Sequence, residues 1–309
     1  MTSETNPGDS PPPMEGLHRS GTVAIVGRPN VGKSTLLNRL IGAKVSITSA
    51  KAQTTRHRIV GVLTQDNAQL AFLDTPGFQT RHVGALNQVL NRTVRQVLSD
   101  ADAVVLVIDA PAGWTLADER VLKLIPADRP VILALNKTDA AGERSGLLPL
   151  VDRVRKAREF AAIVPISAQR GTQLDALIAE CVQLLPPGPP LYEADAITDR
   201  SERFMASEAL REKVFRLVGD ELPYTTTVVI EQFEELPDLR RIRATILVER
   251  EAHRPILLGA GGERMKRIGS EARADLERLF DARVHLEVWV KVKGGWADTE
   301  QSLRAYGYE

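Results

Sequence analysis

Residues Thr22–Ser34 read TVAIVGRPNVGKS and decide the fold of the first half of the chain. The first five residues are an apolar run typical of a buried strand, and an amphipathic helical pattern begins at Lys33. Between them, Gly27–Ser34 fits the pattern G-x-x-x-x-G-K-[ST]. Such a loop offers backbone N–H groups and a helix N-terminus to a phosphate chain. The stretch therefore predicts a nucleotide phosphate site between a strand and a helix.

Within this loop the sequence assigns roles to two side chains. Lys33 is expected to reach the β- and γ-phosphates and is the one catalytic residue that we identify, while the Ser34 hydroxyl is expected to bind Mg²⁺. A chance glycine-rich turn is the alternative, and the strand–helix context disfavours it. The predicted phosphate-binding residues are Gly27, Arg28, Pro29, Asn30, Val31, Gly32, Lys33, Ser34 and Thr35.

Downstream of the loop, short apolar runs alternate with amphipathic stretches. This alternation predicts an α/β domain with a mostly parallel sheet and helices on both faces. We expect strands at Thr22–Val26, Leu70–Leu73, Ala103–Ile108, Val131–Leu135 and Ala162–Ile166, and helices at Lys33–Ile41, Ala85–Leu98, Ala117–Leu124, Leu147–Phe160 and Gln173–Leu185.

Two further elements lie where a γ-phosphate could be sensed. Asp74-Thr75-Pro76-Gly77 follows a predicted strand, so the Asp74 carboxylate can hold Mg²⁺, usually through water, and the Gly77 N–H can report the γ-phosphate. The polar segment before it carries two threonines, and we favour Thr55 over Thr54 as the residue that completes the Mg²⁺ shell and orders the loop. The alternatives are an ordinary turn and an ordinary solvent loop. The switch segment is assigned to Gln53, Thr54, Thr55, Arg56 and His57.

The last element of the first domain would select the base. The Asp139 carboxylate can accept hydrogen bonds from N1–H and the exocyclic amino group of guanine, a donor pair that adenine lacks. Asn136 can tie the base-binding loops together, Lys137 can lie along the ring, and the Ala168 N–H is expected to meet guanine O6. Each motif alone is a plausible turn, but both follow predicted strands at the sheet edge where ligands bind. The set is Asn136, Lys137, Thr138, Asp139, Ser167 and Ala168.

Five motifs together resemble the translation-factor branch of P-loop GTPases. In chain order they are Gly27–Ser34, Gln53–Arg56, Asp74–Gly77, Asn136–Asp139 and Ser167–Ala168. The resemblance implies GTP binding with Mg²⁺ and slow hydrolysis to GDP. Phe78, counted with the nucleotide-binding residues, stands where Ras-like proteins have the glutamine that orients the attacking water, and a phenyl ring cannot hydrogen-bond to water. No general base is therefore identifiable, and another group, ion or partner is expected to stimulate hydrolysis. Asn30 matches an asparagine that helps bind K⁺ in similar GTPases, so we hypothesise K⁺-stimulated turnover; a turn-closing role is the alternative.

Four prolines in five residues, at 186–190, end the α/β pattern, because proline continues neither a helix nor a central strand. We therefore divide the chain into a disordered Pro/Ser/Thr-rich tail (1–16), a nucleotide-binding domain (17–185), a linker (186–199) and a second domain (200–309). The second domain has the order helix–strand–strand–helix–helix–strand. Its predicted elements are Glu202–Val218, Thr225–Phe233, Arg240–Glu251, Pro255–Leu258, Glu263–Phe280 and Arg283–Lys293.

Gly259 and Gly262 lie three residues apart between the two adjacent helices of the second domain. This is the G-x-x-G loop of a KH module, which clamps a few nucleotides of single-stranded nucleic acid, and the element order looks like the type II arrangement. A simple helix–helix turn is the alternative. Although residues 200–309 are close to neutral, Arg254–Arg273 holds five basic and two acidic residues, which predicts a basic edge beside the loop. The predicted RNA-binding residues are Leu258, Gly259, Ala260, Gly261, Gly262, Arg264, Lys266, Arg267 and Arg273.

From about Leu17 to Glu309 the sequence resembles the Era family of bacterial GTPases. The resemblance implies a ribosome assembly factor, switched by GTP and GDP, whose KH domain binds 16S rRNA near its 3′ end and assists maturation of the 30S subunit. It further implies a monomer in the cytoplasm, with a peripheral association to the inner membrane. Two other classes stay open: a small-molecule kinase or ATPase, which Asn136–Asp139 disfavours, and a GTPase whose KH-like domain binds a protein or a membrane.

The composition excludes several other classes of protein. The 309 residues are 43% hydrophobic and 26% charged, with a mean hydropathy of −0.15, which is ordinary for a globular protein. Forty basic residues balance forty acidic ones, so net charge indicates no partner. A single cysteine, Cys181, excludes an internal disulfide and a cysteine-based zinc site. No apolar run is long enough to span a membrane, and residues 1–13 lack the apolar core of a secretory signal.

Overall fold

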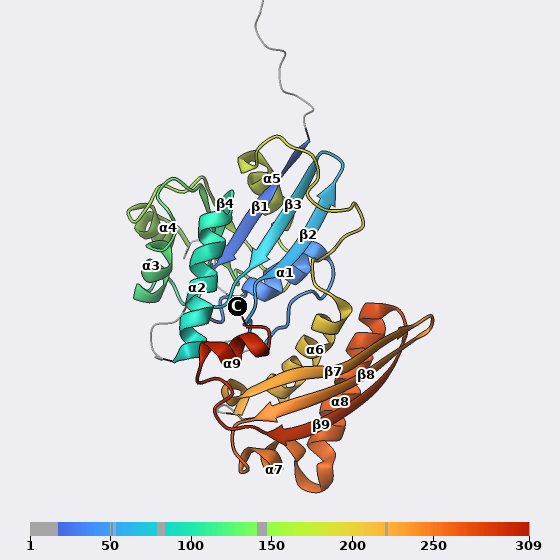
Figure 1. The fold of residues 1–309 in the computed structure, drawn as a ribbon. Coiled ribbons are helices and arrows are strands. Elements are labelled where there is room, and N and C mark those ends of the chain that lie inside the picture. Colours follow the sequence, from blue (N-terminus) through green and yellow to red (C-terminus); the bar gives the residue numbers. More distant parts are fainter. Residues whose placement is uncertain are drawn as a thin grey trace, which may run out of the picture.

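The computed structural model describes residues 18–49, 51, 54–78, 84–140, 147–219 and 222–308. The expected tail at 1–16 and the switch residue Gln53 lie outside them. Figure 1 shows an α/β part with a large sheet and, beside its lower edge, a smaller part with a three-stranded sheet. The predicted fold class, a P-loop α/β domain followed by an α+β domain of type II KH order, is confirmed.

The first sheet has six strands in the order β2-β3-β1-β4-β5-β6. Strand β2 is antiparallel to β3, and all other neighbours are parallel. Parallel strands bring the ends of β1, β3, β4 and β5 to one edge, where ligands of such sheets bind. The strands are β1 (Arg19–Val26), β2 (Ile59–Gln65), β3 (Ala68–Asp74), β4 (Ala103–Asp109), β5 (Val131–Asn136) and β6 (Ala162–Pro165).

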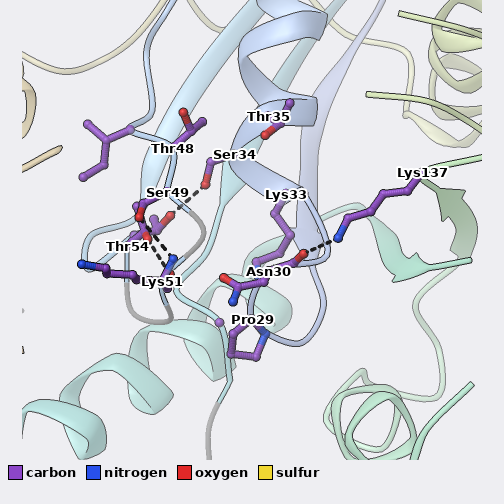
Figure 2. A pocket seen from close by; sticks show the side chains of 14 residues that line it. Pro29, Asn30, Lys33, Ser34, Thr35, Thr48, Ser49, Lys51, Thr54 and Lys137 are labelled. Atoms are coloured by element: carbon purple, nitrogen blue, oxygen red, sulfur yellow. Dashed lines mark hydrogen bonds between the residues drawn. The ribbon is translucent and has the colours of Figure 1, made fainter. Parts of the chain in front are cut away.

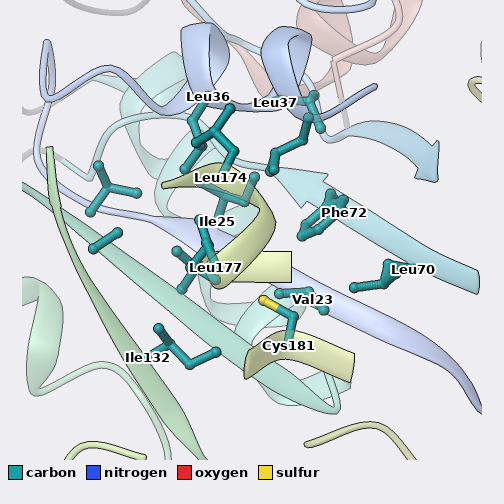
Figure 3. Close-up of a cluster of buried hydrophobic side chains, with 14 of the residues drawn as sticks. Val23, Ile25, Leu36, Leu37, Leu70, Phe72, Ile132, Leu174, Leu177 and Cys181 are labelled. Carbon is teal, nitrogen blue, oxygen red and sulfur yellow. The ribbon is translucent and has the colours of Figure 1, made fainter. Parts of the chain in front are cut away.

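Helices cover both faces of this sheet, as the sequence predicts. Helices α1 and α5 bury Leu36, Leu37 and Leu177 against one face (Figure 3), and α2, α3 and α4 cover the other. Cys181 lies in the first cluster, and burial raises the pKa of its thiol to about 12, so it is an inert core residue. The helices are α1 (Lys33–Ile41), α2 (Ala85–Asp100), α3 (Leu116–Leu122), α4 (Leu148–Arg155) and α5 (Leu174–Leu184).

The second sheet has the order β7-β8-β9, with β7 antiparallel and β9 parallel to β8. Helices α6 and α8 pack on one face of it around Leu210, Ile246 and Ile268. The elements are α6 (Glu202–Leu217), β7 (Thr226–Leu236), β8 (Leu239–Val248), α7 (His253–Leu258), α8 (Glu263–Phe280) and β9 (Arg283–Val292), with single 3-10 turns at Leu222–Thr225 and Ala260–Gly262. No helix among the described residues is long and apolar enough to cross a membrane.

Two elements are absent from the sequence prediction. The sequence predicts no element at strand β2 and none at helix α9 (Glu300–Ala305). Helix α9 belongs to a C-terminal segment in which Trp296, Leu303 and Tyr308 pack against Leu86 and Leu90 of α2. The C-terminal end of the chain therefore joins the two parts of the molecule.

The segment expected to be a linker, 186–199, lies against the first sheet. The Ser20 N–H donates to the Pro186 carbonyl, and the Val62 N–H donates to the Ile197 carbonyl. Buried Gln69 adds side-chain hydrogen bonds to the backbone of Leu191 and Tyr192. The proline-rich segment is thus hydrogen-bonded to the domain that precedes it.

Candidate functional site

The loop between β1 and α1 keeps its backbone close to neighbouring strands because two of its residues are glycine. A Cβ at Gly27 would lie 2.4 Å from the Val107 carbonyl oxygen, and one at Gly32 would lie 2.4 Å from Asn136 Nδ2. Gly32 also has a φ of 101°, in the region that favours glycine. The loop can therefore wrap a phosphate chain only with glycine at these two positions.

Lys33 is buried under this loop. Its Nζ donates to the carbonyl oxygens of Gly27 and Arg28, both at 3.1 Å. Burial lowers the pKa of Lys33 to about 8, although the nearby Asp74 carboxylate raises it. Phosphate oxygens beside Nζ would stabilise the charged ammonium and raise the pKa again. An anion in the loop would therefore keep Lys33 charged over a wider pH range.

Oxygen ligands for Mg²⁺ converge next to Lys33. The Ser34 hydroxyl lies 2.7 Å from Asp74 Oδ2 and 2.8 Å from Thr55 Oγ1, and the Ser46 hydroxyl donates to Asp74 Oδ2 at 2.9 Å. Asp74 Oδ1 is buried without a hydrogen-bond partner among the described residues. A hard cation with hydroxyl, carboxylate and water ligands would satisfy this oxygen, so the residues fit Mg²⁺.

A cavity of about 260 Å³ opens beside these groups and is lined by the phosphate loop and the switch segment. Figure 2 shows Lys33, Ser34 and Thr54 around it, with Lys137 reaching Asn30 from the far side. Gly77 closes another side, because a Cβ there would lie 3.0 Å from Pro29 Cγ. The predicted phosphate and γ-phosphate sensing residues therefore surround one space.

The structure distinguishes the two threonines of the switch. Thr55 Oγ1 faces Ser34 and Asp74, whereas Thr54 Oγ1 donates to the Lys51 carbonyl at 2.6 Å. Arg56 and His57, assigned to a mobile segment from the sequence, instead contact the C-terminal domain: Arg56 donates to the Thr226 carbonyl and the His57 ring stacks on Tyr308 at 4.8 Å. The segment is held between the nucleotide pocket and the second domain.

The base-reading residues lie further along the same sheet edge. Asn136 Nδ2 donates to the Val31 carbonyl and Asn136 Oδ1 accepts from the Ala168 N–H at 2.9 Å, so Asn136 ties the two loops together as expected. The Ala168 N–H, expected to meet guanine O6, is bonded to Asn136 in this structure. Exposed Asp139 accepts a hydrogen bond from the Ser167 hydroxyl at 2.6 Å, and this bond lowers the pKa of its carboxyl. An ionised, oriented acceptor is what guanine requires.

Phe78 packs against the hydrophobic cluster under α2 and α3. Its ring offers no hydrogen bond to water. Lys33 remains the one residue to which the sequence assigns a catalytic role.

In the second domain the G-x-x-G loop joins α7 to α8. Gly259, Gly261 and Gly262 all have positive φ angles, and a Cβ at Gly259 would lie 2.8 Å from Arg264 Cβ. The predicted basic edge is only partly free: Arg264 donates to the Ile256 carbonyl, and Arg267 Nε donates to Glu271 at 2.7 Å. The other three basic residues are exposed: Arg254 on α7, and Lys266 and Arg273 on α8.

Sequence reasoning missed several residues that shape the site. Ser46 bonds to Asp74, and Asp109 at the end of β4 pairs with Lys137 at 2.6 Å. The position of Asp109 at a strand end beside the phosphate loop was a signal that could have been used. Arg211 of α6 donates to the Thr54 carbonyl from the other domain, and no local pattern indicates that contact.

Comparisons with known proteins agree on both parts of the chain. A family model described as 50S ribosome-binding GTPase matches residues 22–137, and a KH domain model matches residues 221–297. GTPase Era of Bordetella avium is 57% identical over 291 residues, which cover 94% of this chain and 98% of that protein.

Two solved structures resemble this chain over 94% of its length and 99% of theirs, each with a TM-score of 0.91 and 42% identity. One is an Aquifex aeolicus Era variant bound to GDP·AlF4⁻. The other is Era in complex with MgGDPNP and nucleotides 1506–1542 of 16S ribosomal RNA. The similarity thus extends through both domains.

Proposed function

The chain belongs to the Era family of GTPases, and from this premise we propose that it binds 16S rRNA near its 3′ end and assists maturation of the 30S subunit. It is a GTPase that binds guanine nucleotide with Mg²⁺ and carries a KH domain. The observation that carries the proposal is the similarity of the whole chain, KH domain included, to an Era protein bound to that RNA.

The residues of the nucleotide site divide the work of GTP binding and hydrolysis. Lys33 would meet the β- and γ-phosphates and Asp139 would accept the guanine donors. The Ser34, Thr55 and Asp74 oxygens, which lie together, would hold Mg²⁺, and the ion would neutralise phosphate charge. Because Phe78 cannot orient water, turnover by the chain alone is slow. Loss of the γ-phosphate removes the contact that orders Thr55, so hydrolysis changes the switch segment.

The switch segment also contacts the second domain, so the state of the nucleotide can affect the RNA-binding domain. Thr55 faces Asp74, while its neighbours Thr54 and Arg56 are bonded to Arg211 and Thr226 of the C-terminal domain. A change at Thr55 therefore alters contacts with α6 and β7. We propose that the GTP form binds RNA and that hydrolysis releases it.

Sedimentation with separated ribosomal subunits tests the choice of partner. We expect the chain to pellet with 30S subunits, because the relative that resembles both of its domains is bound to 16S rRNA, whereas the 50S description belongs to a model matching 22–137 alone. Pelleting with 50S subunits only, or with neither subunit while a protein or membrane fraction retains the chain, would contradict the proposal.

We further propose that K⁺ stimulates hydrolysis through Asn30. This residue lines the phosphate cavity next to Lys33 and Gly77 and has a φ of 65°. A monovalent cation there would supply positive charge to the transition state. GTP hydrolysis should be faster in KCl than in NaCl of equal concentration, and Asn30→Ala should abolish the difference. Equal rates for the wild type in the two salts would refute the idea.

The proposal places the chain in the cytoplasm, where ribosomal subunits mature, and keeps the monomer that the family resemblance implies. The family resemblance also implies a peripheral contact with the inner membrane, and the proposal includes it. Flotation with vesicles of inner-membrane lipids tests this contact, and a chain that stays in the soluble fraction would contradict it.

A further inference from the structure

Helix α6 of the C-terminal domain places a buried arginine against the switch segment. Arg211 Nη2 donates to the carbonyl oxygen of Thr54 at 2.5 Å, and the Arg211 side chain is 2% exposed. This contact joins residues 157 positions apart in the sequence. In Figure 1, α6 lies beside the loop that follows α1, in agreement with that contact.

The guanidinium of Arg211 is fixed by its own helix. Nε donates to Glu208 Oε1 at 2.7 Å and Nη2 donates to Glu208 Oε2 at 2.6 Å, a bidentate pair that sets the plane of the group. The Arg211 Cζ also lies 5.1 Å from the centre of the Phe215 ring. Burial opposes the charge on Glu208, but Arg211 outweighs it and keeps the pKa of that carboxyl below its usual range. The donor thus approaches Thr54 from a defined direction.

Other contacts hold the same stretch of chain along α6. Glu212 accepts from the Thr48 N–H at 3.0 Å and from Lys44 Nζ at 2.5 Å, and the Lys51 ammonium donates to the Val218 carbonyl at the end of the helix. Arg56 Nη1 bonds to the Thr226 carbonyl at 2.9 Å. The contact made by Arg211 differs from these because its acceptor, the Thr54 carbonyl, belongs to the peptide unit that joins Thr54 to Thr55.

A peptide unit is planar, so fixing its carbonyl also fixes the direction of its N–H. With the Thr54 carbonyl held by Arg211, the Thr55 N–H points the opposite way and the start of the Thr55 backbone is fixed. We propose that Arg211 is a positioning residue for GTP hydrolysis: from the C-terminal domain, it holds the Thr54–Thr55 peptide so that the Thr55 hydroxyl stays at the Mg²⁺ site. The inference rests on the role proposed above for Thr55.

The experiment compares Arg211→Gln with Arg216→Gln in the full chain. Arg216 is an exposed arginine on the same helix, which makes it a matched control. Single-turnover GTP hydrolysis is measured together with the affinities for GDP and for a non-hydrolysable GTP analogue, each with Mg²⁺ and with EDTA. A melting temperature close to that of the wild type establishes that the variant is folded.

Arg211→Gln should slow hydrolysis by about tenfold, the effect of losing one charged hydrogen bond. The variant should bind the GTP analogue more weakly than the wild type does in the presence of Mg²⁺. Its affinity for GDP should stay within about twofold of the wild type, since GDP lacks the γ-phosphate that Thr55 senses. Arg216→Gln should match the wild type in every measurement. A folded Arg211→Gln chain with the wild-type rate, or one that loses GDP and analogue affinity equally, would overturn the proposal.

Two further variants keep the result decisive. Arg211→Lys retains the charge but cannot make the bidentate pair while donating to Thr54, so an intermediate rate is expected even if Arg211→Gln does not fold; a wild-type rate would overturn the proposal. Thr55→Ala should slow hydrolysis, and the double variant with Arg211→Gln should hydrolyse GTP only slightly more slowly than Thr55→Ala alone. Full additivity would show that Arg211 does not act through Thr55. A wild-type rate for Thr55→Ala would instead refute the proposed role of Thr55 itself.

Discussion

Replacing Asp139 with asparagine should lower the affinity for GDP by about 100-fold or more, because two hydrogen bonds to an ionised carboxylate are lost. The Ser167 hydroxyl already binds Asp139 Oδ1 at 2.6 Å and orients the group. In the variant, an amide NH₂ would face the N1–H and amino group of guanine, and donor would meet donor. Xanthine carries a carbonyl in place of that amino group, so the same variant should bind xanthosine diphosphate better than the wild type does.

Fluorescence titration with labelled GDP, xanthosine diphosphate and ADP measures this change of specificity. Asp128→Asn is the matched control, since Asp128 is an exposed aspartate of the same domain that is not part of the predicted site. It should leave all three affinities unchanged. If Asp139→Asn bound GDP about as tightly as the wild type, Asp139 would not read the base.

The second large effect concerns the G-x-x-G loop. Gly259→Asp together with Gly262→Asp should reduce affinity for a single-stranded 16S rRNA 3′-end oligonucleotide by about 100-fold, because two carboxylates would face the phosphates that the loop is proposed to clamp. Both glycines have positive φ, and a Cβ at Gly259 would lie 2.8 Å from Arg264 Cβ, so the loop backbone itself must shift.

Leu236→Asp together with Ala274→Asp is the control for added charge. Leu236 lies at the β7–β8 turn and Ala274 twelve residues along α8 from the loop, and both are exposed. This chain should keep nearly wild-type RNA affinity, measured by anisotropy at a fixed salt concentration. Hydrolysis by the loop variant in the absence of RNA should stay normal, which separates RNA binding from folding. Unchanged RNA affinity in the loop variant would refute the KH function.

The nucleotide pocket was predictable from the sequence because each of its motifs is local. A strand, a glycine turn and a helix are adjacent in Thr22–Ile41, and the parallel sheet places Asp74 and Asn136 at the same edge as that turn. The choice of Thr55 over Thr54 agrees with the hydroxyl contacts. The selection of guanine by Asp139 stays a prediction, since it depends on a base that the chain alone does not contain.

Strand β2 was missed although the sequence carried a signal for it. Ile59–Gln65 and Ala68–Asp74 are separated by only Asp66 and Asn67, a pair typical of a tight hairpin turn. The Asp66-Asn67 pair before the apolar run Leu70–Leu73 is therefore the local feature that indicates this hairpin.

The interface between the domains could not be predicted from local patterns. Arg56 and Arg211 are both charged and would be assigned to the surface by composition alone. Each contacts the other domain through a partner more than 150 positions away: Thr226 and Tyr308 for Arg56, and Thr54 for Arg211, which also pairs with Glu208 on its own helix. Such pairings depend on how the two domains meet, which hydrophobic periodicity does not encode.

Sedimentation with 30S subunits in the two nucleotide states tests most directly whether the bound nucleotide controls the affinity for ribosomal RNA. Wild-type chain is incubated with 30S subunits and Mg²⁺, once with GDP and once with a non-hydrolysable GTP analogue, and the bound fraction is titrated in each case. We expect much tighter binding with the analogue, and no tight binding in either state for the Gly259→Asp, Gly262→Asp chain. Equal affinity of the wild type in the two states would contradict the coupling between Thr55 and the C-terminal domain.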